Sequence, residues 1–418
     1  MSNPDKVVLV CTSTEATTTS KNNSNKFHEW VKLPNGNYTH RYGRVGDPGV
    51  SHEVDASKMQ SKMRDALRNG YKEVALVDSQ TPSAPAARGG AAAKTAVEEI
   101  AQGDPIITKL VNFLSEQNVH NISTSTTLKY DAASGLFSTP LGIVTQDSID
   151  EARKCLAAAQ GLVNFPGIVQ TQANGVAAAY MMLIPTDIGR DRPTFERLFP
   201  DLDAIGKQND ILESLEGSLA MAAKQIPSKT KVQAPRVWDI KLTKMSDDKE
   251  IKRISTKFET TGNYSVRGFK VRNVYDLTIN HMAKAFALAK HQLGNVEEMW
   301  HGTCVGNILS IFAKGLIIPS QHSNGRRFGN GVYASRESGK SMGYAGKFQS
   351  KVRTSCYMFL VDVAMGKPYT PDHDTKSLPK GFDSMDAIPG KTRSVDQHEA
   401  IVYNTAQVSI RRLIEFAA

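Results

Sequence analysis

Two stretches poor in bulky apolar residues divide the 418-residue chain into three segments, each of which needs a core of its own. Thr81–Lys94 consists almost entirely of small residues, proline and glycine, and Lys224–Arg236 has four basic residues, two prolines and no acidic residue. Such stretches are typical of linkers, because they offer little apolar surface for burial. At roughly 100–200 residues per domain, the length favours two to four domains. We predict domains at residues 1–80, 95–223 and 237–418, with linkers at 81–94 and 224–236.

The composition excludes several classes of protein. With 40% hydrophobic and 22% charged residues, the chain is neither disordered nor collagen-like. It has no run of 18 apolar residues and no basic region leading into an apolar stretch at its N-terminus, so we expect it to be neither membrane-spanning nor secreted. The four cysteines show no metal-ligand spacing, so we interpret them as free thiols and expect no metal site. They are Cys11, Cys155, Cys304 and Cys356.

The first segment is predicted to be a small α/β domain. Two strand-like runs, Trp30–Leu33 and Tyr38–Tyr42, flank an Asn35-Gly36 pair, and this pattern indicates a β-hairpin. We interpret Trp30 as a core residue of this hairpin. An amphipathic helix ending near Gly70 is predicted by apolar residues that recur every four positions, which are Met59, Met63, Leu67 and Tyr71.

The second segment is predicted to be all-helical. Asp104-Pro105 suits the start of a helix, and Ser148–Glu151 has the pattern of a capping box. Two apolar stripes at helical spacing are interpreted as core. They are Ile149, Ala152, Leu156, Ala159 and Val163, and then Ile211, Leu212, Leu215 and Leu219.

The third segment is predicted to be an α+β domain with a largely antiparallel sheet. One helix is expected at roughly Asp276–Leu293, and short β-rich runs separated by glycine and asparagine follow it. These runs are centred on Trp300, Tyr357–Val363, Ile401–Val408 and Ile410–Phe416.

In three stretches of the third segment, polar residues stand beside glycines within apolar strands. They are Trp300–Thr303, then Phe328–Tyr333 continuing to Lys340, Ser341 and Tyr344, and finally His398–Tyr403. Each stretch alone has a structural explanation, since a histidine beside a glycine is more often structural than catalytic. Gly329–Gly331 is too short for a dinucleotide-binding motif, and Glu399 could be an ordinary edge-strand charge.

Together and in this order, the stretches closely resemble the catalytic domain of the poly(ADP-ribose) polymerases. The His-Tyr-Glu triad of that family matches His301, Tyr333 and Glu399. The second segment, with Leu183–Pro185 and Asp187–Gly189, resembles the helical regulatory domain of the DNA-dependent members. The first segment resembles a WGR domain, with tyrosine in place of tryptophan in Tyr42-Gly43-Arg44. The resemblance implies a mixed, mostly antiparallel ADP-ribosyltransferase fold after the helical domain.

The resemblance also implies NAD+ as the substrate and roles for individual residues. The Gly302 backbone and the Ser341 hydroxyl would hold the nicotinamide carboxamide between the rings of Tyr333 and Tyr344. Glu399 would bind the 2′-hydroxyl of the nicotinamide ribose, oppose the positive charge that develops on the ribose and help to activate the acceptor. The remaining residues implied at the NAD+ site are His301, Thr303, Asn307 and Lys340, and those implied at a DNA break are Tyr42 and Arg44.

The function implied is that of a DNA-break-activated glycosyltransferase, an enzyme that cleaves NAD+ and releases nicotinamide. It would build short poly(ADP-ribose) on acceptor proteins, including itself, during DNA repair. Its partners would be NAD+, 5′-phosphorylated DNA breaks and acceptor proteins, without a membrane or a metal. We expect it in the nucleus of a eukaryotic host, or otherwise in the cytoplasm or nucleoid. Two alternatives stay open: a mono(ADP-ribosyl)transferase on the same fold, and a DNA-end-binding protein with a degenerate catalytic domain.

Overall fold

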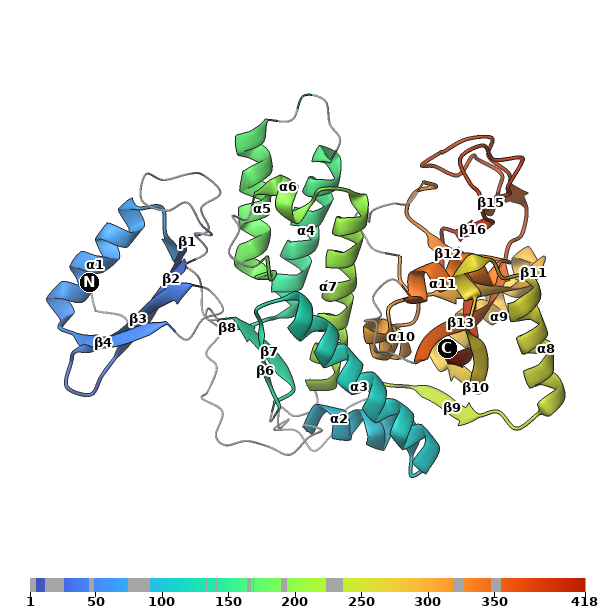
Figure 1. The fold of residues 1–418 in the computed structure, drawn as a ribbon, viewed down its shortest axis with the longest axis horizontal. Coiled ribbons are helices and arrows are strands. Elements are labelled where there is room, and N and C mark those ends of the chain that lie inside the picture. Colours follow the sequence, from blue (N-terminus) through green and yellow to red (C-terminus); the bar gives the residue numbers. More distant parts are fainter. Residues whose placement is uncertain are drawn as a thin grey trace. The chain divides into compact units, whose positions relative to one another are not determined.

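In the computed structural model of the protein, the chain forms two compact units (Figure 1). Unit 1 holds Met1–Arg88 and His120–Leu219, and unit 2 holds Gly89–Val119 and Ala220–Ala418. The division between the units therefore falls within the segment that we predicted as one domain, 95–223. The structure describes residues 5–11, 26–44, 49–73, 91–132, 134–139, 142–163, 167, 169–188, 194–222, 236–318, 327–346 and 355–417. Most of both predicted linkers lies outside these ranges.

The N-terminal part of unit 1 is an antiparallel sheet with the strand order β4-β3-β2-β1-β5. β2 and β3 form the predicted hairpin, and Gly36 in its turn has a φ of 86°, a value that favours glycine. This confirms the hairpin prediction. The strands are β1 (Lys6–Cys11), β2 (Lys26–Lys32), β3 (Tyr38–Arg44), β4 (Val50–Val54) and β5 (Lys72–Glu73).

The helix α1 (Ala56–Arg68) confirms the predicted amphipathic helix. Asp55 caps its N-terminus, and Met59 is buried in one apolar cluster with Trp30 of the sheet, as expected for a core tryptophan. Leu67 differs from the prediction, because it is 44% exposed while its neighbour Ala66 is buried instead. Near its C-terminus, α1 therefore buries Ala66 where the sequence pattern predicted Leu67.

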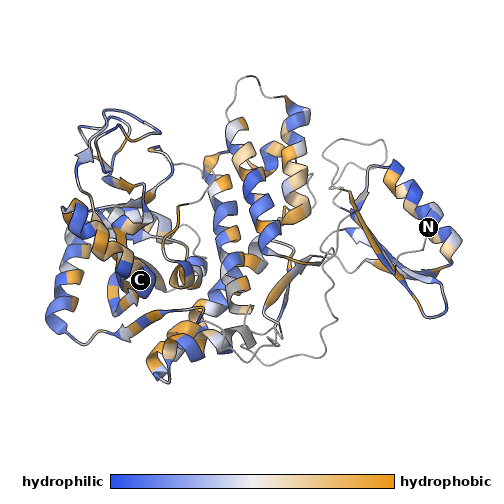
Figure 2. Ribbon diagram, turned by 180° about the vertical axis from the view of Figure 1, so that it is seen from behind, coloured by the Kyte–Doolittle hydropathy of each residue, from blue (hydrophilic) through white to orange (hydrophobic). Residues whose placement is uncertain are grey.

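The rest of unit 1 is mainly helical, and hydrophobic and hydrophilic residues alternate along its helices (Figure 2). Its helices are α4 (Gln146–Leu162), α5 (Gln170–Leu183), α6 (Phe195–Leu198) and α7 (Leu202–Ala222), together with the end of α3 (Pro105–Ser125). The Tyr180 hydroxyl donates to Gln208 Oε1 at 2.8 Å in the buried region where α5 meets α7. Seven residues of the two predicted stripes are buried, which are Ile149, Ala152, Leu156, Ala159, Ile211, Leu212 and Leu215.

Two details of this region were predicted wrongly. The N-cap of α4 lies three residues earlier than predicted, because Thr145 rather than Ser148 caps the helix and accepts a hydrogen bond from the Ser148 N–H. The region is also not all-helical, since three short strands form a separate sheet. These strands have two to four residues, too few to show a period in the sequence. They are β6 (Lys129–Asp131), β7 (Leu136–Thr139) and β8 (Gly142–Ile143).

Unit 2 contains two sheets, with strand orders β11-β13-β17-β10-β9 and β12-β16-β15-β14. Every described strand pair in them is antiparallel except β14 with β15, which confirms the predicted mixed, mostly antiparallel fold. The first sheet comprises β9 (Ile240–Lys244), β10 (Lys270–Ile279), β11 (Val296–Gly302), β13 (Ser355–Ala364) and β17 (Val408–Ala417). The second comprises β12 (Val332–Ala334), β14 (Pro368–Tyr369), β15 (Ser384–Ala387) and β16 (Glu399–Val402).

The helix predicted at Asp276–Leu293 was wrong at its start. Residues 276–279 belong to β10, where Leu277 and Ile279 are buried at the two-residue spacing of a strand, and the helix α9 begins at Asn280. The helices of unit 2 are α2 (Ala91–Ala96), the first part of α3, α8 (Asp248–Thr260), α9 (Asn280–Leu293), α10 (Ile308–Lys314) and α11 (Ser338–Gly346). Short helical turns are η1 (Val97–Ala101), η3 (Tyr264–Val266), η4 (Val305–Asn307) and η5 (Thr405–Gln407).

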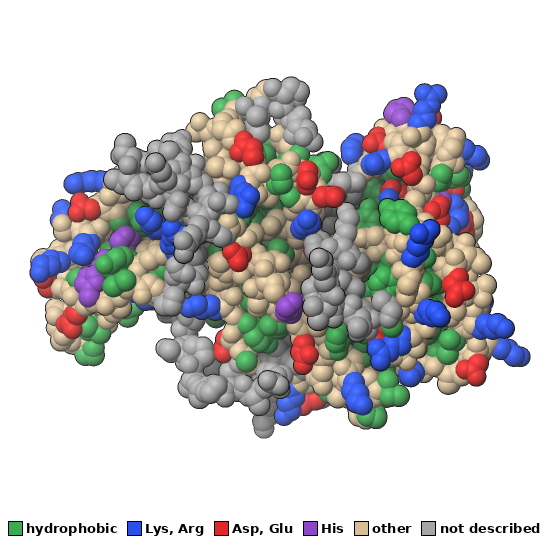
Figure 3. Space-filling model, viewed as in Figure 1, with side chains coloured by type: hydrophobic (Ala, Val, Ile, Leu, Met, Phe, Trp, Pro, Cys, Tyr) green, Lys and Arg blue, Asp and Glu red, His purple; other side chains and the backbone are tan. Residues whose placement is uncertain are grey.

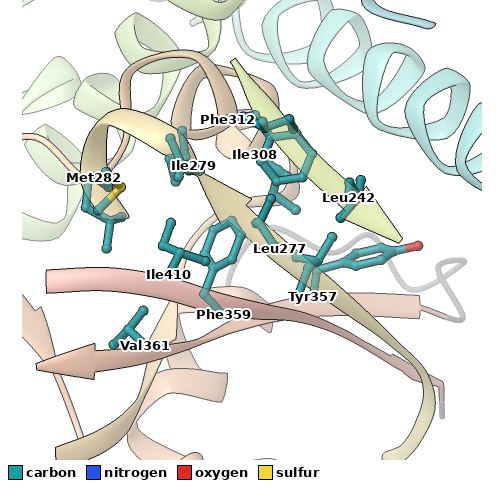
Figure 4. Packing of buried hydrophobic residues seen from close by; sticks show 14 of the residues in the cluster. Leu242, Leu277, Ile279, Met282, Ile308, Phe312, Tyr357, Phe359, Val361 and Ile410 are labelled. Carbon is teal, nitrogen blue, oxygen red and sulfur yellow. The ribbon is translucent and has the colours of Figure 1, made fainter. Parts of the chain in front are cut away.

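The core of unit 2 joins parts of the chain that are far apart in sequence. Leu242, Leu277, Phe312 and Phe359 pack together between the first sheet and α10 (Figure 4). The same cluster includes residues of η1 and the first part of α3. Those residues are Ile100, Ala101, Ile107, Leu110, Val111 and Leu114. The first part of α3 is therefore part of the core on which the catalytic candidates are built.

Candidate active site

His301 and Gly302 are the last two residues of β11, at the end of the strand where the chain leaves the sheet. Their sheet partners on β13 are Phe359 and Met358. His301 Nδ1 lies 2.8 Å from the carbonyl oxygen of Tyr333, which accepts a hydrogen bond from it when Nδ1 carries the proton. Two members of the predicted triad are thus directly linked, and the imidazole ring has a fixed orientation.

Tyr333 lies on β12, opposite Ile401 of β16. Its hydroxyl donates to the carbonyl oxygen of Gly329 at 2.9 Å and accepts a hydrogen bond from the Phe328 N–H at 3.1 Å. Gly329 has a φ of 78°, and a Cβ on it would lie 2.1 Å from the Lys376 carbonyl oxygen, so this turn requires glycine. Tyr333 therefore closes the turn with its hydroxyl.

The helix α11 carries Lys340, Ser341 and Tyr344, and its beginning is anchored to the end of α8. The Ser338 hydroxyl donates to the Phe258 carbonyl oxygen at 2.7 Å, and the Ser338 N–H donates to Thr261 Oγ1 at 3.2 Å. These bonds satisfy polar groups at a helix terminus that would otherwise be unpaired. They also hold the start of the helix in place.

Gly302 and Ser341 are in close contact. A Cβ on Gly302 would lie only 1.8 Å from the Ser341 carbonyl oxygen, so the end of β11 and the first turns of α11 touch through backbone. Ser341 is 4% exposed. The two residues assigned to the nicotinamide carboxamide are therefore brought together by the fold, although 39 positions separate them in the sequence.

Replacing Gly302 with alanine should sharply weaken binding of benzamide, an aromatic carboxamide. The new methyl group would overlap backbone of α11, so the helix must move away from β11. Gly343→Ala is the matched control on α11, because a Cβ there meets nothing within 4 Å. Calorimetric titration of both variants with benzamide measures the effect. Equal affinities would show that the contact between β11 and α11 does not form the carboxamide site.

Glu399 begins β16 and is 6% exposed. Lys340 Nζ lies 2.5 Å from Glu399 Oε1, and the same ammonium group lies 5.7 Å from the ring centroid of Tyr344. Tyr344 is 48% exposed, so its ring is available to a planar ligand. The ion pair holds the Glu399 carboxylate at the start of β16, where its negative charge can oppose a developing positive charge.

The two remaining candidates at the NAD+ site differ in exposure. Thr303 lies in the loop directly after β11 and is half-buried, whereas Asn307 is fully buried in η4. The Asn118 side chain of α3 donates to the Gly306 carbonyl oxygen at 2.8 Å, directly before Asn307. The loop after His301 is therefore attached to the first part of α3. The roles assigned to Thr303 and Asn307 stay predictions.

Sequence reasoning missed a charged cluster beside these residues. It comprises Arg336, three residues after Tyr333, and His398, directly before Glu399, together with Glu297 and Asp386. The available signal was that Arg336 and His398 each stand within three residues of a triad position. Such residues are common on surfaces, so the signal was weak on its own.

The two DNA-contact candidates lie on β3. Tyr42 is 36% exposed and is the outer ring of an aromatic stack, whereas Arg44 is the last residue of the strand and pairs with Lys26 of β2. Trp30 and His40 stack with centroids 4.7 Å apart, and His40 and Tyr42 follow at 5.0 Å. Figure 3 shows histidine side chains gathered on this part of the molecule, with lysine and arginine side chains around them.

Two histidines in this stack share a hydrogen bond, with His28 Nδ1 and His40 Nε2 2.8 Å apart. Burial, followed by the charges of Lys62 and Lys26, lowers the pKa of His28 to about 4. Burial, followed by the charges of His28, Lys62 and His52, lowers the pKa of His40 to about 3. Both rings are therefore neutral in the folded sheet at neutral pH.

We predict that this sheet loses stability as the pH falls. The unfolded chain protonates its histidines near pH 6.5, but the folded sheet does so only near pH 4 and below. The stabilisation is thus complete above pH 6.5 and decreases toward pH 4, by at most about 1.4 kcal/mol per pH unit for each histidine. Hydrogen exchange of the β2–β3 amides in the full chain measures this loss of stability, once the exchange rates are corrected for the intrinsic effect of pH. The amides of β13 and β17 are the internal control. Constant protection of β2–β3 down to pH 4.5 would contradict the prediction.

A metal or a membrane is not indicated in the described part of the chain. Within the described ranges, no group of three or more His, Cys, Asp or Glu side chains is placed to hold a metal ion. No helix within those ranges is both long enough and apolar enough to span a bilayer.

Comparisons with known proteins agree with this geometry. Residues 248–394 match the family model of the poly(ADP-ribose) polymerase catalytic domain, and residues 104–239 match that of the poly(ADP-ribose) polymerase regulatory domain. The catalytic match includes His301, Tyr333 and Ser341 and ends shortly before Glu399. The regulatory match includes the whole of α3, although the first part of that helix packs in unit 2.

Relatives with curated names extend the match over most of the chain. Protein mono-ADP-ribosyltransferase PARP3 of mouse is 27% identical, over 94% of this chain and 86% of its own length. The human protein of that name is also 27% identical, over 88% of this chain and 74% of its own length. Poly [ADP-ribose] polymerase 1 of chicken is 25% identical, over 66% of this chain and 30% of its own length.

These findings identify the class of enzyme. The chain contains a poly(ADP-ribose) polymerase regulatory domain and a poly(ADP-ribose) polymerase catalytic domain, for which NAD+ is the substrate. It is an NAD+ ADP-ribosyltransferase of the poly(ADP-ribose) polymerase family.

Proposed function

We propose that this enzyme transfers ADP-ribose from NAD+ to acceptor proteins, including itself, in response to DNA breaks. The observation that carries the proposal is the grouping of His301, Tyr333 and Glu399 with the Gly302–Ser341 contact. All of these residues except Glu399 lie within the part of the chain that matches the catalytic domain. Because it would respond to DNA damage, we place the enzyme in the nucleus if the host is eukaryotic, and in the cytoplasm or nucleoid otherwise.

The proposed reaction exchanges one bond for another at a single carbon of NAD+. The bond between C1′ of the nicotinamide ribose and the ring nitrogen breaks, and nicotinamide leaves with the bonding electron pair. An acceptor group then forms a bond to C1′ and loses its proton to Glu399 or to solvent. The ribose carries positive charge between these events, so a nearby carboxylate stabilises the transition state.

The placement of the residues proposed to bind nicotinamide supports the roles proposed for them. The contact between Gly302 and Ser341 brings a strand end and a buried hydroxyl together, which suits a carboxamide that both donates and accepts hydrogen bonds. The rings of Tyr333 and Tyr344 offer faces for stacking the nicotinamide. His301 and Thr303, at the end of β11, would bind the adenine ribose, and Asn307 would support the same loop.

Glu399 and its partner Lys340 would act at the reacting carbon. The carboxylate would bind the 2′-hydroxyl of the nicotinamide ribose, oppose the charge on C1′ and accept the proton of an acceptor hydroxyl. The Lys340 ammonium, 2.5 Å away, would keep the carboxylate oriented. No step requires a metal ion.

Two product lengths are candidates. Glu399 favours short poly(ADP-ribose), because activating a ribose hydroxyl is what extends a chain. Transfer of single units is favoured by the relatives that match most of the chain, which are named as mono-ADP-ribosyltransferases. Both candidates use the same bond exchange and differ only in whether ADP-ribose itself serves as the acceptor.

Incubating the full chain with labelled NAD+, with and without 5′-phosphorylated nicked DNA, tests the proposal. We expect labelled protein on a gel, with more label when DNA is present. A ladder would indicate short polymers and a single band would indicate single units. Absence of transfer under both conditions would refute the proposed activity, and equal transfer with and without DNA would refute DNA activation.

DNA activation is proposed to start at the N-terminal sheet and to act through the helical domain. The exposed ring of Tyr42 and the cation of Arg44 lie two residues apart on β3, a combination suited to the end of a DNA strand and its phosphate. The matched regulatory domain would restrict access of NAD+ until DNA binds, as implied by the resemblance to DNA-dependent members of the family.

We predict that Arg44→Ala weakens binding of 5′-phosphorylated nicked DNA and reduces the stimulation of activity by DNA. A phosphate contact reads no base, so binding should weaken alike for all sequences, and the slope of log affinity against log salt should fall by about one unit. Fluorescence anisotropy over a range of salt concentrations measures both effects. Arg68→Ala on α1 is the control, since Arg68 is exposed and pairs only with neighbouring Asp65 among the described ion pairs. Unchanged binding by Arg44→Ala would remove β3 from the interface.

A further inference from the structure

The four residues Arg336, His398, Asp386 and Glu297 form a connected charged cluster beside the proposed catalytic centre. The Arg336 guanidinium binds Glu297 of β11 through Nε and Nη2, at 2.7 and 2.8 Å. It binds Asp386 of β15 through Nη1 and Nη2, at 2.8 and 3.3 Å. One side chain therefore joins the strand of His301 to a strand adjacent to β16.

His398, the residue directly before Glu399, is held at all of its polar atoms. Its Nδ1 accepts a hydrogen bond from the Arg336 backbone N–H at 3.0 Å, so in the neutral ring the proton lies on Nε2. That nitrogen donates to Asp386 Oδ1 at 2.7 Å, and Arg336 Nη1 also contacts it. The backbone N–H of His398 donates to Glu337 Oε1 at 3.1 Å, and its carbonyl oxygen accepts from the Ser335 hydroxyl at 2.7 Å.

The turn at residues 335–337 that holds His398 is itself fixed to β11. The Ser335 N–H donates to the Trp300 carbonyl oxygen at 2.9 Å, and the Trp300 N–H donates to the Ser335 carbonyl oxygen at 2.7 Å. Trp300 directly precedes His301. A continuous set of bonds therefore links the strand end that carries His301 and Gly302 to the residue that precedes Glu399.

Two members of the cluster are held in their charged forms. Burial raises the pKa of Asp386, but hydrogen bonds from His398 and Arg336, together with the charge of Arg336, outweigh burial and hold this pKa below its usual value. The hydrogen bonds that Arg336 donates to Glu297, with a further contribution from those it donates to Asp386, raise the pKa of Arg336. A guanidinium between two carboxylates is a rigid connection, because its planar donors set the orientation of each bond.

We propose that Arg336 is a positioning residue that acts through His398 to hold Glu399 at the reacting carbon. This inference rests on the role proposed above for Glu399. Arg336 does not touch Glu399 in any described contact, and its effect passes through the backbone and ring of His398. Without the guanidinium, Asp386 loses one of its two partners and the turn at 335–337 loses its side-chain connection to β11 and β15.

The test compares Arg336→Gln with Arg253→Gln in the full chain. Arg253 is the matched control, because it binds Glu298 on the same strand with two bonds of 2.8 Å and has a comparable exposure, but it has no contact with His398 among the described bonds. We expect Arg336→Gln to lower kcat at least about tenfold, with KM for NAD+ and benzamide affinity within about threefold of the parent. Arg253→Gln should change none of the three. An unchanged kcat in Arg336→Gln, or an equal loss of benzamide binding, would overturn the proposal.

Two further variants distinguish positioning from general loss of folding. His398→Asn can still accept the hydrogen bond from the Arg336 N–H, so it should retain more kcat than His398→Ala. The double variant Arg336→Gln with Glu399→Gln should be no slower than Glu399→Gln alone, because a residue that acts through Glu399 has no effect once Glu399 is removed. Additive losses in the double variant would overturn the inference. A Glu399→Gln single variant with full activity would instead refute the proposed role of Glu399 itself.

Discussion

Replacing Glu399 with glutamine is expected to lower the rate of ADP-ribose transfer by about 10²–10³-fold while NAD+ still binds. Glutamine keeps the size of the side chain and can still hydrogen-bond, but it removes the negative charge that opposes the positive charge on the ribose. Loss of one pre-organised electrostatic contact typically has an effect of that size. Elongation should be lost first, since the same carboxylate would activate the hydroxyl of the growing chain.

Steady-state transfer from labelled NAD+ measures the rate, and titration with benzamide measures whether the pocket is intact. Glu259→Gln is the matched control, because Glu259 is exposed on α8 in the same unit. Undiminished product from Glu399→Gln would exclude Glu399 from the reaction. A parallel loss of benzamide affinity would show instead that the substitution disturbed the fold.

A fragment that begins at residue 237 is expected not to fold, whereas a chain that lacks only residues 120–219 should fold. Five large side chains from residues 100–114 are buried in the core of unit 2, which are Ile100, Ile107, Leu110, Val111 and Leu114. Burial of each stabilises the fold by about 1.5–3 kcal/mol. Their sum is comparable to the whole stability of a typical domain, about 5–15 kcal/mol.

Polar contacts add to the apolar contribution. Glu99 Oε2 of η1 accepts hydrogen bonds from the Val237 N–H at 2.9 Å and the Trp238 N–H at 3.1 Å. Its carbonyl oxygen accepts from Arg236 Nη2 at 2.8 Å, and Asn118 of α3 donates to Gly306. A fragment that begins at residue 237 leaves the Val237 and Trp238 N–H groups and the Gly306 carbonyl oxygen without these partners and exposes the apolar face of the core.

The deletion variant joins Val119 to Ala220 through a short Gly-Ser linker, so that unit 2 is complete. We expect it to be soluble, with a cooperative thermal transition and with activity that no longer depends on DNA. The fragment 237–418 should be insoluble or lack that transition. A stably folded, active 237–418 fragment would show that η1 and α3 are dispensable. A folded deletion variant that still requires DNA would refute restriction by the helical domain.

Much of the fold was predictable because its signals are local. The Asn35-Gly36 turn, the four-residue spacing of α1 and the continuous apolar run of β13 each depend on a few neighbouring residues, so the sequence displays them directly. The errors also have local causes. The strands β6 to β8 are too short to show a period. Asp276–Ile279 is a strand because β9 pairs with it along its whole length, and β17 pairs with it at Asp276.

The sequence by itself determined the order of the motifs in the catalytic domain, and with it the class of enzyme. His301, Tyr333, Ser341 and Glu399 stand within motifs that can be recognised without coordinates. Only the tertiary structure decided which groups meet: Gly302 with the Ser341 backbone, Arg336 with Asp386 and His398, and the first part of α3 with the catalytic core. Residues 50 and 62 positions apart form these bonds, and no local preference of the chain encodes such a distance. Close packing selects these contacts, because a buried charge or backbone group is stable only where a partner from another element reaches it.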